Sequence, residues 1–226
     1  MFNNVVRQGK AGYFCTFPDV IVVTEADKER VMAKYDPDLY ELRHVSKENM
    51  IPFLGGCFYI NGAAGVRFND TDARIPAETM VEKPEDGGED FGNLSNPDLV
   101  RWLLLLHQLP DDENKKESPA FGMFADKMEQ ELVKAKFIIP AKTEGEQYII
   151  AIQNGKGDKQ AARLYTDWGK LRIVYDPTWA GILQTVDEII ESHDVIINAT
   201  GETSRALYLS KEDYERIKSR ASSSGE

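Results

Sequence analysis

The chain has 226 residues, of which 42% are hydrophobic and 29% are charged, and its formal net charge is −11 at pH 7. This composition is typical of a globular protein with enough apolar residues for a core, so it argues against wholesale disorder. A strongly negative protein repels phosphate groups, which argues against binding to nucleic acid and to anionic membrane surfaces. We attribute the acidity mainly to solubility.

The beginning of the chain, MFNNVVRQGK, lacks the apolar stretch of a secretory signal. The longest apolar run, residues 102–106, is far shorter than the about 20 residues that cross a bilayer. The two cysteines, Cys15 and Cys57, form no CxxC motif. We therefore expect a cytoplasmic protein with reduced thiols.

The hydrophobic patterning stops at residues 82–96, a segment rich in acidic residues, glycine and proline that we predict to be a linker or long loop. It separates an N-terminal α+β half, residues 1–81, from a longer domain at residues 97–218. The last residues, 219–226, are expected to form a frayed, disordered tail because their sequence is SRASSSGE.

The first half contains three apolar stretches that we interpret as strands. They are VIVVT at residues 20–24, CFYI at residues 57–60 and GVRF at residues 65–68. Cys57, at the head of the second of these strands, is expected to be a small buried hydrophobic residue.

Two helices are predicted to open the second half. Asn96, Pro97 and Asp98 supply an N-cap, a proline at the first helical position and an early acid, so the first helix begins there and ends before Pro110. Its apolar positions nearly encircle it, which predicts a largely buried helix. The second helix is predicted at residues 119–135, where apolar side chains recur at helical spacing.

Short strands dominate the sequence after residue 135. A proline at position 140 indicates a sheet edge or a strand end, and the two strands around the glycine-rich turn at residues 154–158 are expected to form a hairpin. The predicted strands are residues 136–141, 147–153, 162–166, 195–200 and 206–209.

The remaining segments are predicted turns and helices. Residues 167–171 are expected to turn the chain, and Asp176 with Pro177 predicts the start of a helix around residues 178–193. Ser210 and Asp213 have the spacing of a capped helix start. The complete order of elements predicts an α+β fold, with a mixed, largely antiparallel sheet flanked by helices.

A faint internal repeat links the two halves. VIVVTEADKERVMAKYDP in the first half resembles ARLYTDWGKLRIVYDP in the second, and CFYINGAAGVRFNDTDARI resembles DVIINATGETSRALYLSKEDYERI. The match pairs Tyr35 with Tyr175 and Asn61 with Asn198. The tyrosine and the asparagine are 26 residues apart in the first half and 23 residues apart in the second. These matches favour a degenerate duplication in which the first copy lacks the leading helices.

The segment HDVIINATGETS, residues 193–204, has the form of a strand beside a dinucleotide cofactor. The chain nevertheless has no GxGxxG motif, and the glycines at residues 154–158 lie between strands and lack the ending of a P-loop. We therefore interpret Asn198 as a turn residue that tolerates positive φ, and we expect no cofactor.

The sequence supplies no clear catalytic or metal-binding set. His44, His107 and His193 have no second histidine or cysteine at ligand spacing, so we expect no metal site. No GxSxG motif is present, and we assign no catalytic residue.

Aromatic side chains cluster near two polar residues in the second half. The simpler interpretation is a small core that joins a helix to the sheet. The alternative is a recognition surface, because Trp and Tyr give large contact areas and Asp167 could orient a basic group of a partner. The candidate binding residues are Tyr165, Asp167, Trp168, Trp179 and Asn198.

Residues 96–216 resemble the SseB protein N-terminal domain family, which is named for enhanced serine sensitivity. The resemblance lies in the paired leading helices and in the ordered segments FIIPAK, YIIAIQN, ARLYTDWGKL and VIINATGETSRALYLSKEDYERI. It implies a sheet-plus-helices domain of a bacterial cytoplasmic protein whose role is unsettled, and it offers no catalytic residues to carry over.

These observations lead us to expect a non-enzymatic module for protein–protein interaction or regulation, which binds an unidentified protein partner or itself. The alternative is a small-molecule or amino-acid binding domain, or an enzyme, that uses the sheet end near Tyr165, Asp167 and Asn198. A third possibility is a purely structural, oligomer-forming role.

Overall fold

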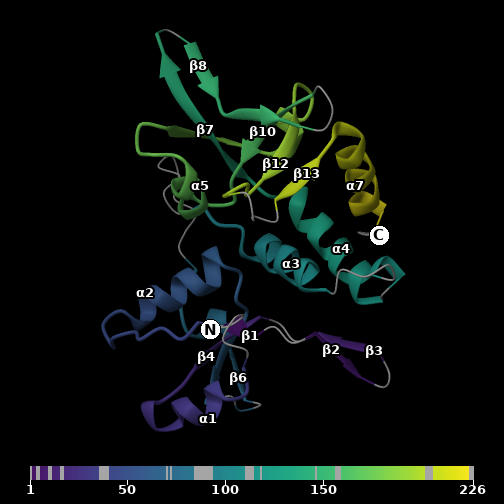
Figure 1. Cartoon of the computed structure of the whole chain (residues 1–226). Coiled ribbons are helices and arrows are strands. Elements are labelled where there is room, and N and C mark those ends of the chain that lie inside the picture. The colour runs from purple at the N-terminus through teal and green to yellow at the C-terminus, as the bar shows by residue number, and fades with distance from the viewer. Residues whose placement is uncertain are drawn as a thin grey trace. The chain divides into compact units, whose positions relative to one another are not determined.

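The computed structural model shows an α+β protein whose sheets are mostly antiparallel, which confirms the fold class predicted from the sequence (Figure 1). Every helix of the described residues is too short or too polar to cross a bilayer. The structure describes residues 2–3, 6–9, 12–15, 18–35, 41–69, 71, 73–83, 94–109, 115–117, 119–145, 147–155, 159–201 and 206–223.

The chain divides into two compact units. The first comprises residues 1–83 and 100–125, and the second comprises residues 84–99 and 126–226. Residues 100–125, which we assigned to the second domain, thus belong to the first unit. Most of the predicted linker at residues 82–96 lies outside the described residues.

The first unit is built on a four-stranded sheet with the order β1-β4-β5-β6. The central pair, β4 and β5, is parallel, and both outer pairs are antiparallel. A separate two-stranded hairpin follows β1 in the chain. The strands of this unit are β1 (Phe2–Asn3), β2 (Val6–Gly9), β3 (Gly12–Cys15), β4 (Asp19–Val22), β5 (Gly65–Phe68) and β6 (Arg74–Pro76).

Short helices connect the strands of the first unit. A 3₁₀ turn (Glu25–Asp27) and α1 (Lys28–Met32) follow β4, and α2 (Met50–Gly55) continues into a wider helical turn, Gly56–Ile60. Residues 57–60 are therefore helical, and the strand predicted there is wrong. The aromatic, β-favouring residues of this segment are buried one after another, and tertiary packing overrides their local preference.

Cys57 is nevertheless buried, as we expected, and burial raises the pKa of its thiol. It belongs to an apolar core that joins α2 to β4 and β5. Val20, Leu54, Phe58 and Val66 are the central members of this core.

The two long helices appear where the sequence predicts them. They are α3 (Pro97–Gln108) and α4 (Pro119–Leu132), and both cross the division between the units. In the first unit their buried contact is formed by Leu105, Leu109, Ala120 and Phe124. The predicted burial of α3 is partial, because Trp102, Leu104 and Leu106 remain half-buried.

The second unit contains two sheets. One has three antiparallel strands in the order β11-β7-β8, and the other has four strands in the order β13-β12-β10-β9. In the second sheet β10 and β12 are parallel, and the outer pairs are antiparallel. The strands are β7 (Phe137–Glu144), β8 (Gln147–Ile150), β9 (Ile152–Asn154), β10 (Gln160–Leu164), β11 (Ala180–Gln184), β12 (Asp194–Ile197) and β13 (Leu207–Leu209).

The hairpin predicted around residues 154–158 is present as the β9–β10 pair. The prediction that Pro140 lies at an edge or a strand end is wrong, because β7 is the middle strand of its sheet. The carbonyl of Pro140 accepts a bond from the N–H of Ala151 at 2.9 Å. Proline has no N–H, and at position 140 this donor would point to the same side of β7. On that side Ile138 pairs with Tyr165 and residues 141–144 pair with β8. Because Pro140 lies between these two partners, the absent donor costs the sheet little.

The helix predicted at residues 178–193 is also wrong over its first part. Residues 180–184 form β11, and the helix α6 is confined to Val186–Ile189. Gly181 lies so close to its neighbours that a Cβ there would be 2.4 Å from Ile138 and 2.7 Å from Trp168, so the strand depends on contacts distant in sequence. The actual helix start is Thr185, whose N–H and hydroxyl donate to Glu188 at 2.7 and 2.9 Å.

Two further predictions are corrected near the chain's turns and end. Residues 168–174 form the helix α5 (Trp168–Val174), where we expected a turn. The final helix, α7 (Lys211–Ser223), begins as predicted, with Ser210 and Asp213 exchanging cap hydrogen bonds. It continues through residues 219–223, which we expected to be frayed, and Arg220 in this stretch pairs with the buried Glu129.

The two four-stranded sheets share one pattern of strand directions: antiparallel, parallel, antiparallel. In each sheet the later central strand, β5 or β12, is followed by an asparagine at positive φ. The φ angle is 49° for Asn69 and 57° for Asn198. The N–H of Asn69 donates to Val22 O and its Oδ1 accepts from the N–H of Thr24. The N–H of Asn198 donates to Leu164 O and its Oδ1 accepts from the N–H of Thr166, which is the same arrangement.

Candidate functional site

The structure brings the five predicted binding residues into one region of the second unit. Tyr165 follows β10, and Asp167 and Trp168 form the start of α5. Trp179 precedes β11, and Asn198 follows β12. The tyrosine ring of Tyr175 links the region, because it lies 6.0 Å from the ring of Tyr165 and 4.8 Å from that of Trp179.

Tyr165 is an interior residue. Its side chain has no exposed surface, and its hydroxyl donates to the carbonyl of Ala199 at 3.0 Å. Burial raises the pKa of Tyr165 to about 12, so the phenol stays neutral at physiological pH. This residue therefore anchors the segment after β12 to the end of β10.

Asp167 is also directed inward, with 1% of its surface exposed. One carboxylate oxygen accepts from the backbone N–H of Lys170 at 2.9 Å, which caps α5. The other accepts from the hydroxyl of Thr166 at 2.9 Å and from the ammonium group of Lys170. The charge of Asp167 is thus neutralised inside the protein, and its hydrogen-bonding capacity is used by its neighbours.

Asn198 closes the turn after β12 in the left-handed conformation that we predicted for it. Its side-chain oxygen accepts from the N–H of Thr166 at 3.0 Å, and the Thr166 hydroxyl, whose shorter bond goes to Asp167, lies 3.2 Å from the same oxygen. Asn96 completes this junction, because its amide donates to the carbonyls of Thr166 and Lys136 at 2.9 Å each. The polar residues at this sheet end therefore hold strands and helix together.

The two tryptophans are half-buried and covered by cations. The guanidinium of Arg172 lies 5.1 Å from the ring of Trp168 and donates to the carbonyl of Trp179 at 2.9 Å. The ammonium of Lys142 lies 5.7 Å from the ring of Trp179. These contacts join α5 and β7 to Trp179, the residue before β11, as expected for a small core between helix and sheet.

Described residues line cavities of ≈ 300, ≈ 540 and ≈ 270 Å³. None of these three is lined by any of the five predicted residues. The described residues also contain no group of three or more His, Cys, Asp or Glu side chains that could hold a metal ion.

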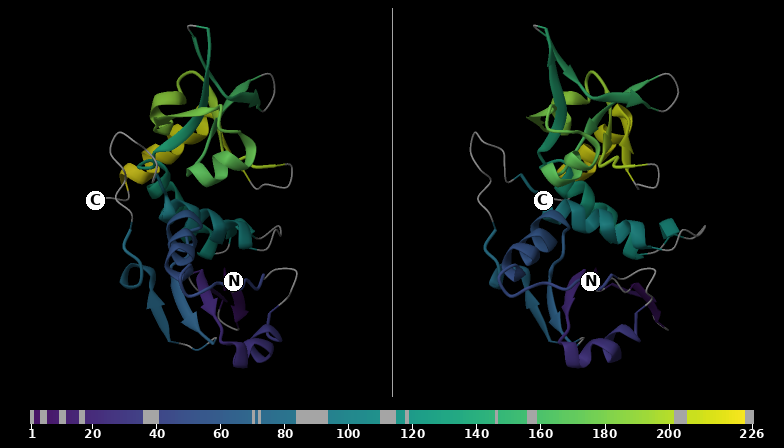
Figure 2. Two further views of the ribbon diagram at one scale, coloured as in Figure 1. Left: turned by 90° about the vertical axis from the view of Figure 1, so that its left-hand side faces the viewer. Right: turned by 60° about the vertical axis from the view of Figure 1, so that its left-hand side comes forward.

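The β7–β8 hairpin, which extends from the body of the second unit, carries a surface that was not predicted from the sequence (Figures 1 and 2). β8 and β9 are consecutive in the chain, and each is the outermost described strand of its sheet. Together they form an edge, residues 147–154, that we call the strand edge. Its exposed fractions are 77% for Tyr148, 40% for Ile149 and 42% for Ile152.

The strand edge has the sequence QYIIAIQN, which contains no charged residue, proline or glycine. The pattern predicted a strand here, but strand prediction does not show which strand is outermost in a sheet. The second unit thus combines an internally bonded polar junction with an exposed apolar edge. Comparison of the chain with known protein families, with characterised proteins and with solved structures finds no match.

Proposed function

We propose that the protein is a non-enzymatic interaction module, and that its strand edge pairs with the same edge of a second copy. The main observation behind this proposal is the exposure of Tyr148 and Ile149 on β8 and of Ile152 on β9, the outermost described strands of their sheets. Side chains alternate between the faces of a strand, so Tyr148 and Ile149 place apolar surface on both faces.

An outermost strand presents backbone N–H and C=O groups that can pair with another chain. Natural proteins usually protect such edges with lysine, proline or bulges. The strand edge has no charge or proline along its eight residues, although 29% of the whole chain is charged. Its composition is that of a segment that forms β-structure between chains.

The distribution of charge favours a second copy as the partner. A protein with a net charge of −11 that bound a basic partner would be expected to present acidic residues on the contact surface. The strand edge presents none. Two identical edges can pair antiparallel about a two-fold axis, which satisfies the backbone groups of both and avoids contact between like charges.

Sedimentation velocity at increasing protein concentration tests the proposal. The wild-type chain is expected to form dimers at micromolar concentration, whereas Tyr148→Lys is expected to remain a monomer. Ile173→Lys is the matched control, because Ile173 is 67% exposed on α5, away from the strand edge, and it should dimerise like the wild type. A monomeric wild type, or equal association of all three proteins, would refute the proposal.

We further propose that the two four-stranded sheets derive from a duplication. Their common strand order and the matching bonds of Asn69 and Asn198 support it. The predicted correspondence of Thr24 with Thr166 agrees with these bonds. The counterpart of Asn198 is Asn69, however, and not Asn61, because Asn61 ends a helical turn.

In this proposal, residues 96–216 form an SseB-like domain of a bacterial cytoplasmic protein. The support is the resemblance of FIIPAK, YIIAIQN, ARLYTDWGKL and VIINATGETSRALYLSKEDYERI to segments of that family, in the same order. These segments supply β7, β8 with β9, β10 with the start of α5, and β12 with β13. A sequence profile built from close homologues of this chain should match the family over residues 96–216, and a profile without such a match would contradict the assignment.

A further inference from the structure

We infer that two strand edges join in one register, in which Ala151 of each copy lies at the two-fold axis. This inference rests on the proposed function, because it names the geometry of the same contact. Two observations carry it. The first is which backbone groups of the strand edge are already bonded within one chain, and the second is the point at which the edge passes from one sheet to the other.

Ala151 connects the two halves of the strand edge. Its N–H donates to the carbonyl of Pro140 of β7 at 2.9 Å, and its carbonyl accepts from the N–H of Arg163, in β10, at 3.0 Å. The N–H and the carbonyl of one residue in an antiparallel strand point to the same side. β7 and β10 therefore lie along one side of the strand edge, and the structure describes no further strand on the other side.

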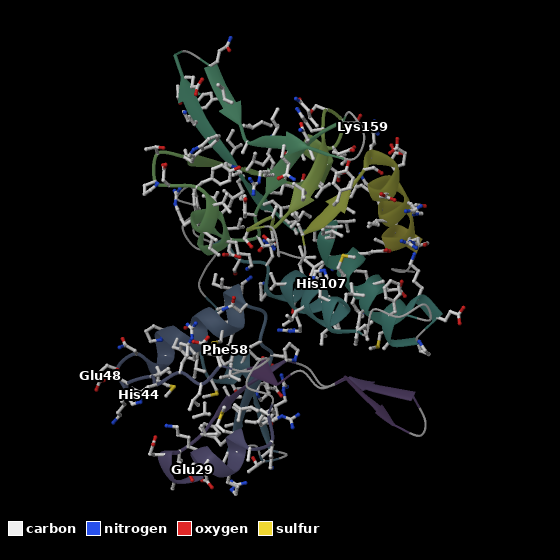
Figure 3. All side chains as sticks on the ribbon, viewed as in Figure 1. Glu29, His44, Glu48, Phe58, His107 and Lys159 are labelled. Atoms are coloured by element: carbon white, nitrogen blue, oxygen red, sulfur yellow. The ribbon has the colours of Figure 1, made fainter. Side chains whose placement is uncertain are left out.

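The bonds of Ala151 determine which groups of the edge face outward. Residues in an antiparallel pair alternate between bonded and non-bonded positions, so the odd-numbered residues 147–155 bond to β7 or to the β10 strand and its flank. The N–H of Gly155 agrees with this alternation, since it donates at 2.8 Å to the carbonyl of Lys159, which is labelled in Figure 3. The residues that direct their N–H and carbonyl groups to the free side are Tyr148, Ile150, Ile152 and Asn154.

Pairing about a two-fold axis uses all four of these residues in only one register. In that register Tyr148 is opposite Asn154 of the second copy, and Ile150 is opposite Ile152. Ala151 then faces its own counterpart at the axis, and each of the opposed pairs exchanges two backbone hydrogen bonds. A shift by two residues in either direction would leave Tyr148 or Asn154 opposite a residue outside β8 and β9.

The change of sheet along the strand edge selects the same register. β8 and β9 belong to different sheets, and Ala151 alone separates them. When two identical edges pair, this point occurs once in each copy, and only an axis at Ala151 places the two points opposite each other. β8 of one copy then pairs along its length with β9 of the other, so each three-stranded sheet continues into the four-stranded sheet of the second copy.

The side chains are compatible with this arrangement. Side chains of directly opposed residues lie on the same face of a sheet, so Ile150 and Ile152 of the two copies form one apolar row. Within one chain Ile152 is opposite the buried Ala162 and is itself 42% exposed, so the row would extend the interior of the second unit. The register also brings no two charged residues opposite each other, because the strand edge has none.

Disulfide crosslinking between two single-cysteine proteins tests the register. Both carry Cys15→Ala and Cys57→Ala; one also carries Tyr148→Cys and the other Asn154→Cys. Opposed residues in a bonded pair have Cα atoms about 5.5 Å apart, which suits a disulfide. The mixed dimer of these two proteins is expected to form fastest on mild oxidation, and Tyr148→Cys alone should not crosslink to itself.

The shifted registers have matched partners. Tyr148→Cys is also mixed with Ile152→Cys and with Ile150→Cys, which it would face after shifts of two and four residues. In the inferred register Ile152 is a diagonal neighbour at about 7–8 Å, too far for an easy disulfide. Ile173→Cys, on the exposed face of α5, gives the rate of random collision.

The outcomes separate the register from the proposed function. Fastest crosslinking to Ile152→Cys or Ile150→Cys would overturn the register and leave pairing of the strand edges intact. Dimers that crosslink in none of these combinations faster than with Ile173→Cys would place the contact elsewhere and overturn both. A wild type that sediments as a monomer would refute the proposed function itself, and the register with it.

Amide exchange resolved by residue checks the same register without substitutions. In the wild type the amides of Ile149, Ala151 and Gln153 should be protected at every protein concentration, because they bond within the chain. The amides of Ile150 and Ile152 should gain protection only as the concentration rises. Concentration-dependent protection at the odd-numbered residues instead would contradict the inference.

Discussion

At the scale of single residues, two asparagines determine how the central strands of the two sheets end. A left-handed conformation costs an ordinary L-residue about 1 kcal/mol or more, and asparagine tolerates it because its short side chain bonds locally. Asn198 uses that side chain to hold Thr166, and Asn69 holds Thr24 in the same way. One residue type therefore supplies both the backbone conformation and the link between neighbouring strands.

Asn198→Ala is predicted to lower the free energy of unfolding by about 2–4 kcal/mol, because it adds backbone strain and leaves the N–H of Thr166 without its acceptor. Asn198→Gly should cost about 1 kcal/mol less, since glycine adopts the conformation freely. Urea denaturation of each variant measures this. The corresponding changes at Asn69 should follow the same order with smaller losses, because its bond to Thr24 is exposed. Equal losses for Ala and Gly at position 198 would contradict the role assigned to positive φ.

Alkaline pH is predicted to destabilise the protein through two buried tyrosines. Burial raises the pKa of Tyr165 and of Tyr214 from 10.0 to about 12. Between these values the folded protein retains phenol protons that the unfolded chain loses. The folding stability that each tyrosine contributes through its raised pKa is fully present below pH 10. It is lost as pH rises toward 12, by about 1 kcal/mol per pH unit for each tyrosine.

Urea titrations across this pH range check the prediction, and Tyr165→Phe is the matched variant. It should be less stable than the wild type at neutral pH, because the bond to Ala199 is lost, but its stability should fall less steeply as pH rises. An unchanged slope in Tyr165→Phe would show that this phenol does not titrate as proposed.

At the scale of elements, the correct predictions are those that local signals determine. Asn96 and Pro97 at the start of α3, Ser210 before α7 and the β-branched run of β12 all lie within or next to the elements they specify. β11 was missed because its strand partner β7 is distant in sequence, and the small size of Gly181 has meaning only beside Ile138 and Trp168. The five candidate residues lie in one region, but the sequence did not reveal that Asp167 is buried or that half-buried Asn198 is bonded to Thr166.

The last turns of α7 give an element-scale prediction. Arg220 pairs with Glu129 of α4, which is 7% exposed, and burial raises the pKa of that carboxyl. Arg220→Ala should lower the free energy of unfolding by about 1–2 kcal/mol, since it leaves a poorly solvated charge unpaired, while the exposed arginine limits the loss.

Arg216→Ala is the control on the same helix, because its pair with Asp213 is exposed and should contribute less than about 0.5 kcal/mol. Thermal or urea denaturation measures both, and Glu129→Gln should recover part of the loss in Arg220→Ala. If Arg220→Ala has no effect, residues 219–223 do not stabilise the fold as the helix suggests.

At the scale of the whole molecule, the net charge opposes association of two copies, whereas the apolar strand edge favours it. A charge of −11 keeps copies of the chain apart at long range. The strand edge itself is uncharged, so repulsion between two copies comes from charges outside residues 147–154, and pairing should strengthen as added salt screens them.

Amide hydrogen exchange at low and high protein concentration tests the central proposal most directly, because it locates the contact as well as detecting it. Pairing of strand edges predicts that the amides of residues 147–154 become more protected as concentration rises, while those of α5 do not change. Tyr148→Lys should remove the concentration dependence. Exchange at residues 147–154 that is fast and independent of concentration in the wild type would contradict the proposal that this edge is an interface.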